Sequence, residues 1–116
     1  MAVRYVSLSP REACDRISEA LTGRYLSATE VTSHVTRLAG GGETVIGVFE
    51  RYSFRNSNRM SMSVVCSPSA RDRTEVFFVA SGASSGFFGL FDYGAAEDFE
   101  SVIDRALAEH LVREGD

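Results

Sequence analysis

The densest group of polar side chains that could do chemistry lies in one stretch, between Glu50 and Arg59. Arginine side chains there can hold a carboxylate or phosphate group through two parallel hydrogen bonds, which predicts a site for an anion or an acidic partner protein. The same residue types are also typical of a solvated hairpin turn with Glu–Arg pairs across the strands. The candidate residues, called the arginine turn below, are Glu50, Arg51, Tyr52, Arg55, Asn56, Asn58 and Arg59.

A second candidate is the loop rich in glycine and serine that begins at Gly82. Backbone N–H groups in such a turn can bind anions. However, no Gly-Lys-Ser/Thr follows, the glycines do not have G-x-G-x-x-G spacing, and the serine pair lacks the strand–turn–helix setting of a nucleophile elbow. A hinge that packs the aromatic residues after it is the simpler interpretation. The candidate loop residues are Gly82, Ser84, Ser85 and Gly86.

The remaining chemically capable residues are scattered. His34 and His110 are far in sequence from each other and from any cysteine or acid pair at ligand spacing. Cys14 and Cys66 form no CxxC motif, and we expect them to be free, buried thiols, with one structural disulfide as the alternative. We therefore expect a protein that is not an enzyme, has no cofactor and holds no metal.

Length and composition predict one globular domain that spans residues 1–116. The hydrophobic content of 44% is ordinary for a folded chain and is sufficient for a core without disulfides. The net charge of −4 argues against a nucleic-acid binder, which needs a basic surface. Residues 1–10 have no basic segment followed by an apolar one, and no apolar run approaches about 20 residues. We therefore expect a cytoplasmic protein that has no signal peptide and does not bind membranes.

Charge is distributed unevenly along the chain. Residues 51–73 contain five arginines and one acid, whereas residues 92–116 contain eight acids and two arginines. All twelve basic residues are arginine. Codon bias in a GC-rich genome would explain this, and so would selection for bidentate contacts with anions.

Three short runs predict the centre of a β-sheet: Val45–Tyr52, Met60–Cys66 and Glu75–Ala80. The segment Ser27–Ala39 is ambiguous, because some apolar residues have helical spacing while its many β-branched residues favour a strand. We interpret it as a strand, since the three glycines at 40–42 then form a turn into the next strand. Val3–Leu8 predicts a short first strand.

One helix is expected before this sheet and one after it. Ser9-Pro10-Arg11-Glu12 has the pattern of a capping box with proline at the first helical position. Near the C-terminus an apolar stripe indicates an amphipathic helix from about Glu97 onward. The predicted fold class is α+β: an antiparallel meander of four to five strands, packed with an N-terminal and a C-terminal helix in the order β-α-β-β-β-β-α.

The segments Val45–Phe49 and Thr74–Ser81 are apolar on both faces. Met60–Cys66 instead alternates as a half-buried strand does, with one face made by Met60, Met62, Val64 and Cys66. Val45 and Phe49 point one way while Ile46 and Val48 point the other. A strand with one face in water would alternate between apolar and polar residues, so we expect both faces to be covered. Either the helices lie on opposite faces, or a second copy covers the face that they leave free. Soluble monomers rarely expose such a patch, which predicts a homodimer.

The arginine turn carries a resemblance to a known family. Glu50-Arg51-Tyr52, followed by Arg55-Asn56-Ser57-Asn58-Arg59, resembles the turn of a small bacterial family numbered as domain of unknown function six-zero-five-four. The segment Ser81–Phe99 resembles the glycine, serine and aromatic segment and the acidic helix of that family. The resemblance covers about Leu8 to Leu107, with Met62 where leucine is typical. It implies the fold but no activity, because the family has none assigned.

Two functions are compatible with these observations. The first is a non-enzymatic interaction or scaffold module that self-associates, as expected from the two apolar faces of the central strands. The alternative is a small-molecule or anion-binding protein, with a pocket between the sheet and the C-terminal helix and its mouth at Arg51–Arg59.

Overall fold

The computed structural model describes residues 2–24, 28–53, 58–70, 72–82 and 93–113. The elements in chain order are β1 (Ala2–Val6), α1 (Pro10–Arg24), β2 (Ala28–Arg37), β3 (Glu43–Ser53), β4 (Asn58–Ala70), β5 (Arg73–Gly82), α2 (Tyr93–Leu107), a 3-10 turn η2 (Ala108–His110) and β6 (Leu111–Val112). The predicted α+β class and the order β-α-β-β-β-β-α are confirmed.

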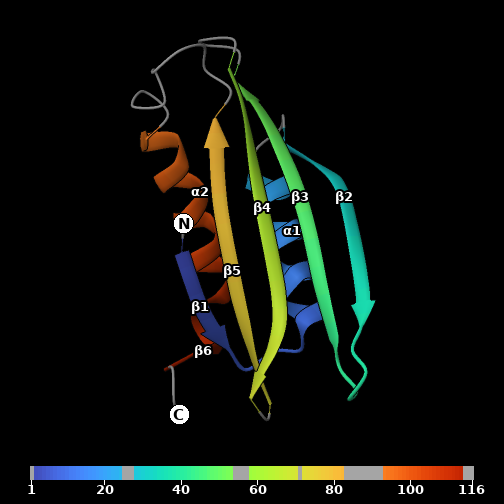
Figure 1. Cartoon of the computed structure of the whole chain (residues 1–116). Helices are drawn as coiled ribbons and strands as arrows, with labels where there is room; N and C mark the ends of the chain where they lie inside the picture. The colour runs from blue at the N-terminus through green and yellow to red at the C-terminus, as the bar shows by residue number, and fades with distance from the viewer. Residues whose placement is uncertain (1, 25–27, 54–57, 71, 83–92, 114–116) are drawn as a thin grey trace.

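The strands form one antiparallel sheet in the order β2-β3-β4-β5-β1-β6 (Figure 1). The meander β2 to β5 was expected, but the sheet is larger than the predicted four to five strands. The sixth strand is only two residues long, and Tyr5 and Val6 of β1 pair with it. A two-residue strand leaves no periodic pattern in a sequence, which is why it was not predicted.

Within the ambiguous segment Ser27–Ala39, residues Ala28–Arg37 form a strand, as predicted. β2 lies at the edge of the sheet, and most of its side chains are exposed on both faces. Its apolar residues therefore do not form the buried stripe of a helix. The turn into β3 uses positive φ at Gly41 (95°) and Gly42 (88°), a backbone conformation that glycine adopts without strain.

The start of α1 is the predicted capping box. The Glu12 backbone N–H donates to Ser9 Oγ at 3.2 Å, and the Ser9 backbone N–H donates to Glu12 Oε1 at 3.2 Å. Two of the N–H groups at this helix start are therefore satisfied by the residues that the pattern named.

Both helices cover the same face of the sheet (Figure 1). α1 packs against β2, β3, β4 and β5, and α2 packs against α1 and β5. This excludes the alternative with one helix on each face. The core between the two layers contains every second residue of the central strands, including the predicted apolar face of β4. The buried apolar side chains of β3, β4 and β5 are Val45, Phe49, Met60, Met62, Val64, Cys66, Val76 and Phe78.

An ion pair holds the first strand to the last helix. Arg4 Nε and Nη2 donate to the two carboxylate oxygens of Asp104 at 2.7 and 3.1 Å. The Arg4 guanidinium also lies 5.5 Å from the centre of the Phe78 ring. Nearby, the buried Thr74 hydroxyl donates to the Leu8 carbonyl, which joins β5 to the connection before α1. These contacts fix the helical layer on its side of the sheet.

Candidate functional site

The face of the sheet opposite the helices, called the open face below, carries a strip of apolar side chains. In one row across the strands, Ile46 pairs with Val65, Val65 pairs with Phe77, and Phe77 pairs with Val3. Ile46 is 36% exposed and Val3 is 42% exposed, while the side chains between them are half-buried. In the next row, Ser63 lies between Val48 and Val79. The apolar strip consists of Val3, Ile46, Val48, Val65, Phe77 and Val79.

Polar rows border this strip on both sides. Toward one end of the strands, Thr44 Oγ1 donates to Ser67 Oγ at 3.3 Å and the Tyr5 hydroxyl donates to Glu75 at 3.3 Å. Toward the other end, the hydroxyls of Ser61 on β4 and Ser81 on β5 share a 2.9 Å hydrogen bond. An apolar centre inside a polar rim is the arrangement found in protein–protein interfaces.

The sheet divides the arginine turn between its two faces. Adjacent strand residues point in opposite directions, so Glu50, Tyr52 and Arg59 lie on the open face while Arg51 lies on the helical face. There Arg51 Nη1 is 3.7 Å from Asp98 Oδ2 of α2, and on the open face Arg59 Nη1 donates to Glu50 Oε1 at 3.3 Å.

The other residues of the arginine turn and of the glycine loop are described only in part. Asn58 is the first residue of β4 and pairs with Ser53, and Gly82 is the last residue of β5 and pairs with Met60. Five further candidates lie outside the described residues: Arg55, Asn56, Ser84, Ser85 and Gly86. The structure therefore brings Glu50, Tyr52 and Arg59 together and separates them from Arg51.

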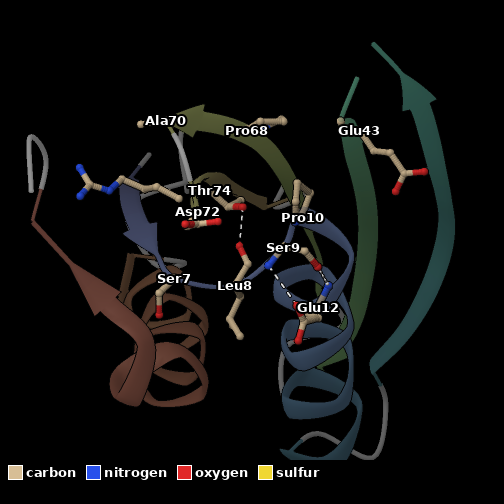
Figure 2. A pocket seen from close by; sticks show the side chains of 12 residues that line it. Ser7, Leu8, Ser9, Pro10, Glu12, Glu43, Pro68, Ala70, Asp72 and Thr74 are labelled. Carbon is tan, nitrogen blue, oxygen red and sulfur yellow. Dashed lines mark hydrogen bonds between the residues drawn. The ribbon is translucent and has the colours of Figure 1, made fainter. Parts of the chain in front are cut away.

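The structure contains a cavity of about 380 Å³ near the connection between β1 and α1 (Figure 2). No residue of α2 lines it, so it is not the predicted pocket between the sheet and the C-terminal helix. Figure 2 shows two hydrogen bonds at the wall of this cavity, one between Ser9 and Glu12 and one between Thr74 and Leu8. The lining residues are Ser7, Leu8, Ser9, Pro10, Glu12, Gly42, Glu43, Pro68, Ala70, Asp72, Arg73 and Thr74.

The two cysteines are free and buried, as predicted. Cys14 of α1 and Cys66 of β4 meet in the core, and the hydrogen bond between their thiols together with burial raises the pKa of Cys66. A thiol that keeps its proton is a poor nucleophile. Within the residues that the structure describes, no group of three or more His, Cys, Asp or Glu side chains could hold a metal ion.

The helices of the described ranges are also too short or too polar to cross a lipid bilayer.

The open face is built from strand residues far apart in the chain, so it follows from the pairing register of the strands and not from any one stretch of sequence. The sequence signal that pointed to it was the apolar character of both faces of β3 and β5.

Comparisons with known proteins support the family but not a function. No curated protein matches the chain. Among solved structures, it is similar to TTHA0849 from Thermus thermophilus, with 14% identity and a TM-score of 0.39 over 93% of this chain and 92% of that one. The model of the family of unknown function DUF6054 matches residues 1–111, and the chain therefore belongs to this family, as the resemblance at the arginine turn predicted.

Proposed function

We propose that this protein is a non-enzymatic interaction module that self-associates through the open face of its sheet. One observation carries this proposal: six apolar side chains gather on the face that neither helix covers, four of them in one unbroken row across the strands. Each buried aliphatic or aromatic side chain contributes roughly 1.5–3 kcal/mol relative to exposure. Covering the strip therefore provides a substantial driving force for association.

The size of the face fits a dimer. β3 has 11 residues, which corresponds to a strand about 35 Å long. The strands from β2 to β1, spaced about 4.8 Å apart, make the face about 24 Å wide, so its area is roughly 800 Å². An interface of standard size takes about 800 Å² from each partner. A second copy that used the same face would supply the matching area.

The pattern on the face suits a two-fold arrangement. Two sheets that pack face to face lie about 10 Å apart, and apolar side chains from both fill the space between them. A two-fold axis through the middle of the strip would set strip against strip and rim against rim. The rim hydroxyls and carboxylates already bond to one another within one chain. These rim groups therefore have hydrogen-bond partners before the face is covered.

The opposite charges of the arginine turn and of the last helix do not support this contact. Such charges could orient the two copies only by pairing between subunits, but Arg51 and Asp98 lie 3.7 Å apart within one chain, and α2 lies on the covered face. Any orientation preference of the dimer must come from the shape of the strip and from its rim.

Sedimentation equilibrium at micromolar concentration tests the proposal. Wild-type protein should have at least twice the mass of the 12.7 kDa chain, and Val65→Lys should lower that mass because an ammonium would be buried at the centre of the strip. Leu111→Lys is the matched control, since Leu111 is 44% exposed on β6 and lies outside the strip. A wild-type protein that sediments only as a 12.7 kDa monomer would contradict the proposal. An unchanged mass of a folded Val65→Lys variant would do so too.

A further inference from the structure

The two edges of the sheet differ in the length of their outer strands. β6 has two residues, whereas β2 has ten and lies at the opposite edge. In the described part of the chain no strand pairs with the outer side of β2, and Figure 1 shows this edge uncovered. Such an edge presents N–H and C=O groups that can pair with another strand. β2 contains neither proline nor lysine, two of the residues that protect edge strands. It does contain a bulge and two charged side chains, which can also limit edge pairing, and their placement decides which partner fits.

A β-bulge places two opposite charges of β2 on the same face. The register with β3 shifts between Glu30 and Thr32, and as a result Glu30 points toward the helical layer, where the Ser18 hydroxyl donates to it at 3.3 Å. Arg37 pairs with Glu43, which is in register with the core face of β3, so Arg37 also lies on the helical side. Without the bulge these two residues, seven positions apart, would point to opposite faces.

We propose that β2 pairs antiparallel with β2 of a second copy, about a two-fold axis at His34, so that two six-stranded sheets become one continuous sheet. In this register His34 lies opposite the partner's His34, and Thr32 lies opposite the partner's Thr36. The partner's Arg37 then lies across from the bulge, beside Glu30. Symmetry repeats this Glu–Arg pair at the other end of the interface.

The charges favour this register over the one in which the two-fold axis passes through Ser33. An axis perpendicular to the sheet must pass through a residue that faces its own copy, because only then do paired side chains share a face. With Ser33 on the axis and the bulge counted in the same way, Arg37 would lie opposite the partner's Ala28, and Glu30 would lie opposite the partner's Val35. That register sets no opposite charges across from each other. With His34 on the axis, opposite charges lie across the strands on one face, which is favourable for the pair.

This contact is independent of the open face. An axis perpendicular to the sheet leaves the helices of both copies on one side and both open faces on the other. Edge pairing therefore neither covers nor requires the apolar strip, and both contacts can exist in one assembly with two perpendicular two-fold axes. The edge contact and the open-face contact can also be tested separately, because Val65→Lys perturbs the apolar strip while it leaves β2 unchanged.

Crosslinking tests the register directly. His34→Cys should form a covalent dimer with a short dimaleimide, because side chains of directly opposed residues lie about 5 Å apart. Thr32→Cys or Thr36→Cys alone should not react with its own copy, since the two sites are about 13 Å apart along the strands, but a mixture of these two variants should crosslink. The native cysteines are buried and should not contribute. No crosslinking of His34→Cys in folded protein, or equal crosslinking at all three positions, would overturn the proposal.

A charge exchange tests the paired ends. Glu30→Arg and Arg37→Glu should each weaken edge pairing at least about fivefold, because each sets like charges across the strands. The double variant should restore it, since the pair is then reversed but complete. These measurements are made in the Val65→Lys background, so that the strip does not contribute. Single variants without effect, or a double variant as weak as the singles, would contradict the register.

Discussion

Gly47 allows α1 to lie close to the sheet, and its replacement should show this directly. Gly47 is a buried residue of β3 on the helical face, in register with Ser33 and Val64. A Cβ atom at this position would lie 3.0 Å from Phe49 Cε2 and 3.2 Å from Cys14 Sγ. Both neighbours are almost fully buried, so neither can move aside without disturbing the core.

We expect Gly47→Ala to destabilise the fold by about 1–3 kcal/mol, the usual cost of adding a methyl group to a packed core. With an unfolding entropy of about 2.1 cal/mol/K per residue, this loss lowers Tm by roughly 4–12 °C for a chain of this length. Thermal unfolding followed by circular dichroism measures the change. Urea unfolding gives the corresponding free energy.

Two further variants separate crowding from other effects of alanine. Gly40→Ala is the matched control, because no atom lies within 4 Å of the position a Cβ would take there, and its effect should be neutral or slightly stabilising. Adding Cys14→Ala to Gly47→Ala should recover part of the loss, since it removes the Sγ atom that the new methyl group contacts. A Gly47→Ala variant as stable as wild type would refute the close approach of α1 to β3.

Other predictions concern the polar contacts. Asp104→Asn should destabilise the fold by about 0.5–1 kcal/mol at low salt and less at high salt, because its partly exposed pair with Arg4 is screened; a loss independent of salt would contradict this. The hydrogen bond from the Ser9 backbone N–H lowers the pKa of Glu12, and Arg11 lowers the pKa of Glu43. The stability that these two contacts give the fold is therefore present above the usual carboxyl pKa of about 4.3, and it is lost as pH falls through the lower pKa values of the folded state. Urea midpoints should therefore fall between about pH 5 and 3 in wild type by more than in Glu12→Gln/Glu43→Gln. Arg59→Ala should leave Tm nearly unchanged, because this side chain is 67% exposed, and should weaken binding of phosphate or an acidic peptide if the arginine turn is an anion site; calorimetry with equal binding by both proteins would exclude that role.

Local patterns in the sequence were sufficient to predict those features of the fold that depend on residues close together in the chain. The capping box of Ser9 and Glu12 joins residues three positions apart, and its hydrogen bonds are those that the pattern predicts. The alternation from Met60 to Cys66 identified the buried face of β4, since the two-residue period of a strand is independent of its neighbours. The strand at Ser27–Ala39 followed from β-branched residues and the glycine turn, although its edge position reduced the periodic signal.

The tertiary structure decided what depends on distant residues. The sequence predicted a covering for both faces of β3 and β5 but did not place the helices, because strands that are apolar on both faces contain no signal for which face a helix covers. Pairing register assembled the open face from Val3, Ile46, Val65 and Phe77, which are far apart in the chain. Register also divided the arginine turn, because adjacent strand residues point to opposite faces however close they are in sequence.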